Sequence, residues 1–172
     1  DWGARVDLGN GCRLHFEPAY HWSARGAFDK RMALWASFVI ETPAGAIYHI
    51  GDTGYHDGAI FRAARQAYPS IRLDVIPIGA YDPRWFMGYG HMHPEETTQA
   101  WDLIGRPFML PTHYRTVQLA DTGYDKPLID LRAAMAAVKA EENRIRPLMA
   151  GEHWWVEEGI GNTGNEIHSP GG

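Results

Sequence analysis

From residue 46 onward, short apolar segments alternate with segments whose apolar residues recur every three to four positions. The first pattern is typical of buried β-strands, and the second is typical of helices that pack one face on a sheet. A chain built from such units folds as a sheet with helices packed on it. We therefore predict an α/β domain with strands at 46–52, 72–81 and 106–114 and helices at 57–68, 94–104 and 126–142.

The part of the chain before residue 46 contains strand patterns only. Residues 12–19 alternate between apolar and polar, and residues 33–42 are rich in aromatic and β-branched side chains, so both segments are predicted strands. A short turn joins 33–42 to 46–52, which predicts that these two strands pair antiparallel. The first ten residues carry little pattern, and we expect a loop at 83–93 and a final strand at 145–156.

The ends and faces of the predicted helices carry local signals. Asp57 is a predicted N-cap of the first helix, and His93 is a predicted N-cap of the second, which opens on Pro94. The third predicted helix has one apolar face, made of Leu128, Leu131, Met135 and Val138.

The composition excludes several classes of protein. A net charge of −5 argues against general nucleic-acid binding, because phosphate contacts need a positive surface. No apolar run approaches the roughly 18 residues of a transmembrane helix, and no signal peptide is visible. We expect a cytoplasmic or peripheral membrane protein. Cys12 is the single cysteine, so no intrachain disulfide forms, and we predict that it is a small core residue.

Four polar residues follow predicted strands: His21, Asp52, His91 and His113. In α/β sheets, ligands bind beyond strand ends, and histidine with aspartate matches the ligand types of a zinc or iron site. Each residue also has a structural interpretation. Asp52 fits an Asx-turn, His21 beside Trp22 fits a residue covering the core edge, and His113 fits a strand cap. The remaining ordered histidines are expected to be structural: His15, His49, His56 and His153.

Four motifs occur in a fixed order: "EPAYHWSAR", "GDTGY", "IPIGAYDPRWFMGYGHMHPEE" and "PTHY". Together they resemble the C-terminal half of the metallo-β-lactamase superfamily, in particular the branch that includes N-acyl-phosphatidylethanolamine-hydrolysing phospholipase D. The resemblance covers roughly residues 12 to 155 and implies half of an αββα sandwich, a mixed sheet with helices on one face. Residues 1–158 would form this half-domain, and 159–172 would form a flexible tail.

The resemblance also implies roles for individual residues. His21 would bind the first of two zinc ions, Asp52 would bridge both, and His113 would bind the second. His91 would lie near the metals and contact the substrate, which makes His91 and Asp52 the expected catalytic residues. Histidine and aspartate also suit iron or manganese. The residue types of the 83–93 loop separately suggest that Arg84, Trp85 and Tyr89 bind a phosphodiester substrate with an apolar tail, and packing of the aromatic side chains under the loop is an equal alternative.

The implied activity is hydrolysis of a phosphodiester in N-acyl-phosphatidylethanolamine-like phospholipids by a hydroxide held between two zinc ions. The family's His-x-His-x-Asp-His motif does not occur in the chain. We therefore expect a fragment of a longer enzyme that is inactive alone. Two alternatives remain. One is a lactonase or another hydrolase on the same fold. The other is an inactive half-domain that self-associates, for example as a homodimer.

Overall fold

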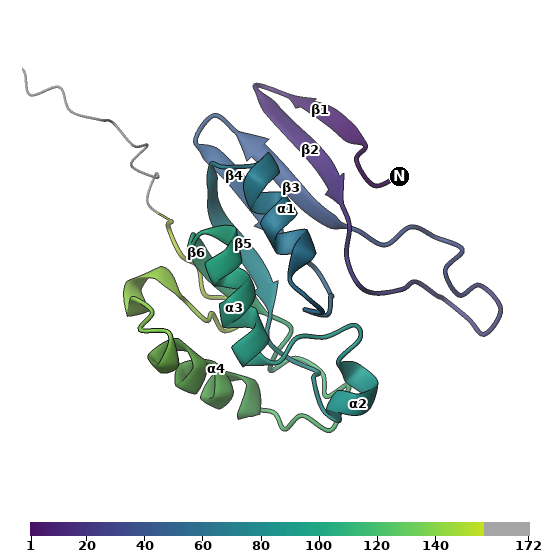
Figure 1. The fold of residues 1–172 in the computed structure, drawn as a ribbon, viewed down its shortest axis with the longest axis vertical. Helices are drawn as coiled ribbons and strands as arrows, with labels where there is room; N and C mark the ends of the chain where they lie inside the picture. Colours follow the sequence, from purple (N-terminus) through teal and green to yellow (C-terminus); the bar gives the residue numbers. More distant parts are fainter. Residues whose placement is uncertain (157–172) are drawn as a thin grey trace, which may run out of the picture.

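The computed structural model describes residues 1–156, and its centre is one six-stranded sheet (Figure 1). The strands lie side by side in the order of the chain. They are β1 (Arg5–Gly9), β2 (Cys12–Glu17), β3 (Ser37–Thr42), β4 (Gly45–His49), β5 (Ile71–Pro77) and β6 (Phe108–Thr112).

Strand direction determines which loops meet. Strands β1 to β4 pair antiparallel with their neighbours, whereas β5 is parallel to β4 and β6 is parallel to β5. The predicted antiparallel pairing of the third and fourth strands is therefore confirmed. Because β2, β4, β5 and β6 all run in the same direction, their carboxyl ends lie along one edge of the sheet.

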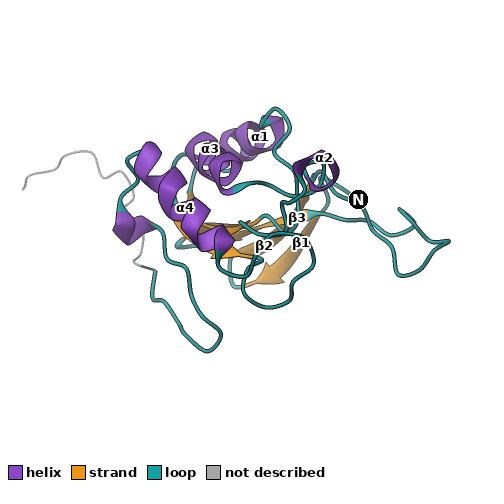
Figure 2. Cartoon of the chain, turned by 90° about the horizontal axis from the view of Figure 1, so that it is seen from below, coloured by secondary structure: helices purple, strands orange, loops and turns teal. Residues whose placement is uncertain are grey.

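The long helices all lie on the same side of this sheet, as Figure 2 shows. They are α1 (Ala59–Ala67), α3 (Pro94–Ile104) and α4 (Lys126–Ala137). Two shorter helices, α2 (Arg84–Met87) and the 3₁₀ helix η1 (Glu142–Arg144), lie in connecting segments. The predicted α/β class, with a mixed sheet and helices on one face, is confirmed.

The core fills the space between the sheet and its helices. Alternate strand residues such as Val39, Tyr48 and Met109 are buried against apolar helix residues such as Phe61 and Trp101. The predicted apolar face of α4 also packs against this core. Leu128 and Leu131 are buried, and Met135 and Val138 are partly buried.

The two predicted helix caps have different outcomes. His93 is the N-cap of α3, as the sequence predicted, and the structure adds a reciprocal capping box with Glu96. The Asp57 prediction is wrong by one residue. The N-cap of α1 is Gly58, at φ +74°, and the Asp57 carboxylate accepts a hydrogen bond from the Ala59 N–H. Asp57 therefore stabilises the turn before the helix.

Other predicted boundaries need correction. The first ten residues contain β1, an exposed edge strand joined to β2 by a glycine-containing turn. The 83–93 loop contains α2, and the strands predicted to reach residues 52 and 81 end at His49 and Pro77. Helix α4 ends at Ala137 rather than at residue 142. Cys12 is only half-buried at the start of β2, so its assignment to the core is wrong.

Residues 145–156 do not form the predicted strand. One isolated bridge joins Ile145 to Met109, and the Arg146 N–H donates to the Met109 carbonyl. Pro147 follows and has no N–H to continue the ladder. The predicted tail at 159–172 lies outside the described residues, as does its boundary with the half-domain. Within the described chain, no helix has the length and apolar character that crossing a bilayer requires.

Candidate metal centre

The four predicted site residues all lie beyond the carboxyl ends of the parallel strands. His21 follows β2, Asp52 follows β4, and His113 follows β6 directly. His91 comes from the longer connection after β5, which contains α2. The sheet edge that carries these loops is the edge at which α/β proteins bind ligands.

The structure brings the four side chains together. His21, Asp52 and His91 each offer one nitrogen or oxygen atom, and these atoms lie within 4.8 Å of one another. His113 extends the group: its Nε2 lies 3.6 Å from Asp52 Oδ1, and its ring centre lies 5.3 Å from that of His91. We call these four residues the His/Asp cluster. His91, which was predicted to contact substrate, is one of the three residues whose donor atoms lie within 4.8 Å of one another.

Hydrogen bonds join the loops that carry His21 and Asp52. The Tyr20 N–H donates to Thr53 Oγ1 over 2.8 Å, and the Gly54 N–H donates to the Tyr20 carbonyl over 3.1 Å. Thr53 is completely buried. The backbones on either side of the cluster are therefore fixed to each other, although they are far apart in the sequence.

Two glycines allow the backbone to pass close to His21 and His113. A Cβ atom at Gly90 would lie 2.9 Å from Cδ2 of His21, and a Cβ at Gly79 would lie 1.7 Å from the His113 carbonyl oxygen. The backbone of His113 has a φ of +62°, which side-chain-bearing residues adopt uncommonly. Such strain is held in place only by tight surroundings, and it is concentrated at functional sites.

Burial controls the protonation of His91. Removal from water lowers the pKa of His91 to about 4. The Asp52 carboxylate opposes this shift, while His113, His21 and Arg84 add to it. The ring is therefore neutral at pH 7. Its Nδ1 is buried and has no hydrogen-bond partner within residues 1–156.

The donor atoms fit a metal ion. His113 Nε2 is a second buried ring nitrogen without a hydrogen-bond partner among the described residues. Burying such a nitrogen unpaired is costly unless something binds it. His21 Nδ1 bonds the Trp22 carbonyl over 2.8 Å, which orients the ring and leaves Nε2 for a ligand. Three imidazoles and one carboxylate suit zinc, and they also suit iron or manganese.

The predicted substrate-binding residues have unequal surroundings. Arg84 donates from Nη2 to both Glu96 carboxylate oxygens at 2.8 Å, and from Nη1 to the His91 carbonyl at 2.9 Å. Its charge is thus paired within the protein, and the contacts favour a role in positioning His91. Trp85 is 87% exposed, and Tyr89 is about half exposed beside His56.

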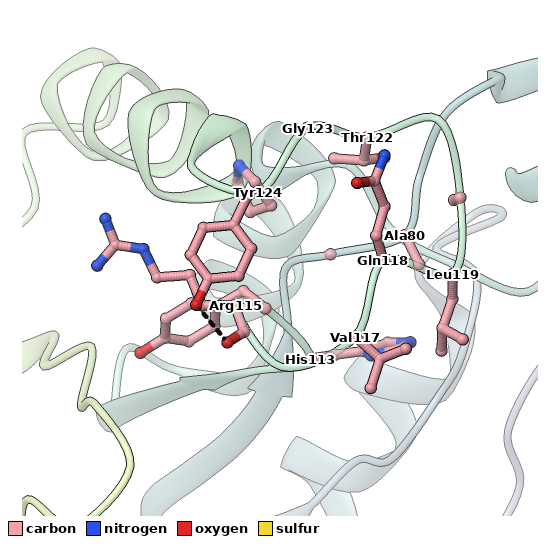
Figure 3. A pocket seen from close by; sticks show the side chains of 13 residues that line it. Ala80, His113, Arg115, Val117, Gln118, Leu119, Thr122, Gly123 and Tyr124 are labelled. Atoms are coloured by element: carbon pink, nitrogen blue, oxygen red, sulfur yellow. Dashed lines mark hydrogen bonds between the residues drawn. The ribbon is translucent and has the colours of Figure 1, made fainter.

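His113 also lines a pocket, together with residues of the segment that follows it (Figure 3). His113 is the one member of the cluster that lines it. The Tyr124 hydroxyl donates to the Arg115 carbonyl across one wall, and the apolar side chains of Val117 and Leu119 stand at its margin.

Sequence reasoning missed several residues that hold the cluster in place: Thr53, Gly79, Gly90 and Glu96. Glu96 carried a usable signal, because a Glu three residues after an N-cap is the pattern of a capping box. The contacts of the other three depend on tertiary structure, since each joins segments that are distant in the sequence.

Comparisons with known proteins agree with this geometry. A family model described as the β-lactamase superfamily domain matches residues 1–114. The outer membrane protein RomA of Klebsiella pneumoniae is 40% identical over 100 residues, covering 58% of this chain and 72% of RomA. N-acyl-phosphatidylethanolamine-hydrolyzing phospholipase D 1 of Caenorhabditis elegans is 33% identical over 107 residues, covering 62% of this chain.

A solved structure shares the fold at low sequence identity. The metallo-β-lactamase fold protein YhfI from Bacillus subtilis superposes with a TM-score of 0.61 at 14% identity, covering 90% of this chain and 53% of YhfI. The chain spans only 30% of the nematode phospholipase. The family model, which matches well over half of the chain, shows that the chain belongs to the metallo-β-lactamase superfamily.

Proposed function

We propose that this chain carries part of the catalytic centre of a metal-dependent hydrolase. The observation that carries the proposal is the convergence of His21, Asp52 and His91 within 4.8 Å, with His113 at 3.6 Å from Asp52. These four residues would hold the metal. When bound, a zinc ion acidifies water and polarises the oxygen of a substrate ester.

Asp52 has the position of a shared ligand. One of its oxygens lies within 4.8 Å of a nitrogen of His21 and of His91, and its Oδ1 lies 3.6 Å from His113 Nε2. A carboxylate has two oxygens, so in this position it suits two ions. We therefore propose a dinuclear zinc centre in which Asp52 is the bridging residue.

His91 contributes through its neutral ring. With a pKa of about 4, it carries no proton to give up as an acid at pH 7. A neutral imidazole still offers one N–H donor and one nitrogen acceptor. We propose that His91 either binds metal through the free nitrogen or donates its N–H to the oxygen on which negative charge develops. Arg84 holds the backbone of His91 in place for this role.

The proposed substrate is a phosphodiester in an N-acyl-phosphatidylethanolamine-like phospholipid. The name of the nematode relative states that it hydrolyses this lipid. Exposed apolar side chains, which suit contact with lipid and with a membrane surface, lie on two segments next to the cluster. They are Trp85 and Phe86 on α2, and Val117 and Leu119 after β6.

The metal part of the proposal is tested by zinc titration calorimetry. Wild type is expected to bind zinc, and His21→Ala and Asp52→Asn are each expected to bind at least about 10-fold more weakly. His153→Ala is the matched control, because His153 is an exposed histidine outside the cluster. Equal affinities in all four proteins would reject the site.

The substrate part is tested by turnover of N-acyl-phosphatidylethanolamine and of an acyl lactone by the zinc-loaded protein and its longer relatives. Faster lipid cleavage supports the phosphodiesterase. Lactone cleavage without lipid cleavage would replace it with a lactonase, which the same fold accommodates.

A further inference from the structure

A single carboxylate oxygen on α4 joins three parts of the chain near the His/Asp cluster. Asp130 Oδ2 accepts a hydrogen bond from the Tyr81 hydroxyl over 2.5 Å and lies 2.5 Å from Lys126 Nζ. The same oxygen lies 3.4 Å from Nε2 of His93. Tyr81 follows β5 and His93 is the N-cap of α3, so Asp130 connects α4 to the segments on both sides of α2.

The contacts hold Asp130 as a charged acceptor. Burial opposes its ionisation, but hydrogen bonds from Lys126 and Tyr81 outweigh that effect and lower the pKa of its carboxyl below the ordinary value. Tyr81 is completely buried, so its hydroxyl needs a partner inside the protein. Hydrogen bonds to an ionised acceptor are stronger than neutral ones, so the carboxylate and its donors keep one geometry.

The contact with His93 leads to His91. A backbone N–H in the first turn of α3 donates to His93 Nδ1 over 3.3 Å, so the proton of the neutral ring is on Nε2, which faces Asp130. The His93 N–H donates to Glu96, and Arg84 donates to the same carboxylate. Arg84 also donates to the His91 carbonyl. The backbone between the two histidines is therefore fixed at both ends, and Asp130 attaches it to α4.

The contact with Tyr81 leads to His113. Gly79, two residues before Tyr81, approaches the His113 backbone so closely that a Cβ atom there would lie 1.7 Å from the His113 carbonyl oxygen. The Tyr81 N–H also donates to Thr122 Oγ1 over 3.1 Å, which ties this segment to the loop that follows His113. By holding the Tyr81 side chain, Asp130 fixes the backbone that His113 contacts.

We propose that Asp130 is a positioning residue that sets the spacing of His91 and His113 in the His/Asp cluster. The two rings come from different connections, and their centres lie 5.3 Å apart. Asp130 acts on one through His93 and on the other through Tyr81. The inference rests on the proposed metal centre, because the spacing of these rings determines how well they hold an ion. Partners that orient metal ligands typically change metal affinity about 10–100-fold when they are lost.

The test is zinc titration calorimetry on variants that circular dichroism shows to be folded. Asp130→Ala is expected to weaken zinc binding by about 10-fold or more, and Asp130→Asn, which keeps one acceptor oxygen, should recover part of the loss. Asp102→Ala is the matched control, because Asp102 also forms an i,i+4 ion pair, with Arg106 on α3, and should bind zinc like wild type. His93→Asn keeps a good N-cap but loses the contact with Asp130, so it should also weaken binding. Combined with Asp130→Ala, its effect should be less than additive, since both changes break one contact.

A metal-free measurement separates this inference from the metal centre itself. In protein with ¹³C-labelled histidine and no zinc, the NMR signals of the His91 and His113 rings are expected to move in Asp130→Ala, while that of His15 on β2 stays in place. If wild type binds no zinc and these two signals still move, the metal centre is rejected and the positioning role is retained. Unmoved signals would overturn the positioning role, and so would equal zinc affinities of Asp130→Ala and the control. If Asp130→Ala does not fold, Asp130→Asn and His93→Asn decide by the same two measurements.

Discussion

Asp74 predicts an unusual dependence of stability on pH. It lies on the helix-facing side of β5, opposite Tyr48 of β4, and is completely buried. Both carboxyl oxygens and the Tyr48 hydroxyl lack a hydrogen-bond partner in the part of the chain that the structure describes. Burial raises the pKa of Asp74 well above its usual range, against a smaller opposing effect of its own backbone N–H. The folded protein therefore keeps this carboxyl protonated to a higher pH than the unfolded chain does.

The sign of the effect follows from proton binding. Above about pH 4, the unfolded chain loses this proton while the folded chain retains it. Stability is therefore highest below that pH and falls as the pH rises toward the raised pKa, by about 1.4 kcal/mol for each pH unit. For a chain of this size, that loss lowers the Tm by roughly 3–6 °C per pH unit.

Asp74→Asn removes the titration and keeps the shape of the side chain. Thermal unfolding in chelator-containing buffer at several pH values above about 4 should show the Tm difference, variant minus wild type, growing by roughly 3–6 °C per unit until the pH reaches the raised pKa. Contributions from other groups cancel in this difference. Asp121→Asn serves as the control, because Asp121 is exposed, and its difference should stay constant. A constant difference for Asp74→Asn too would mean that the carboxyl is ionised or solvated in the folded protein.

Three further substitutions test the geometry around the cluster. Gly90→Ala should push the His21 ring, which lies 2.9 Å from the new methyl group, and weaken zinc binding about 10–100-fold in calorimetry; unchanged affinity would contradict the contact. Arg84→Gln should lower the free energy of urea unfolding by about 1–3 kcal/mol, because the bond to the His91 carbonyl and the ion pair are lost. Gly79→Ala should prevent native folding, since its methyl group would overlap the His113 carbonyl. A melting curve like that of wild type would contradict the close contact between the backbones of Gly79 and His113.

The strands that bury one or both faces were predictable, whereas the exposed ones were not. Strands β2 to β6 have apolar and β-branched runs that only a covered sheet accommodates, and each overlaps a predicted strand. Strand β1 is exposed at all five residues, so hydrophobic burial leaves little signal in its sequence. Helix α2 has four residues, too few for a helical period to show.

The sequence predicted which residues form the site, but it did not predict which residues hold them in place. His21, Asp52, His91 and His113 stand out because each is a polar residue that follows a strand, and strand direction then brings them together. The partners that fix them come from elsewhere in the chain, as Thr53 does for Tyr20. A buried carboxyl such as Asp74 is equally hard to recognise in the sequence, because it interrupts an apolar run without changing the strand pattern.

The His/Asp cluster and the packing of the sheet are consequences of the same strand geometry. A period of two places apolar side chains on both faces of β4, β5 and β6, and the helices cover only one of them. The shared direction of β2, β4, β5 and β6 places the cluster at an edge of this same sheet. The Asp52 side chain is still 44% exposed at that edge. The carboxylate that every other cluster residue surrounds is therefore open to a bound group from the edge of the sheet, while the rest of the sheet serves to hold the loops in place.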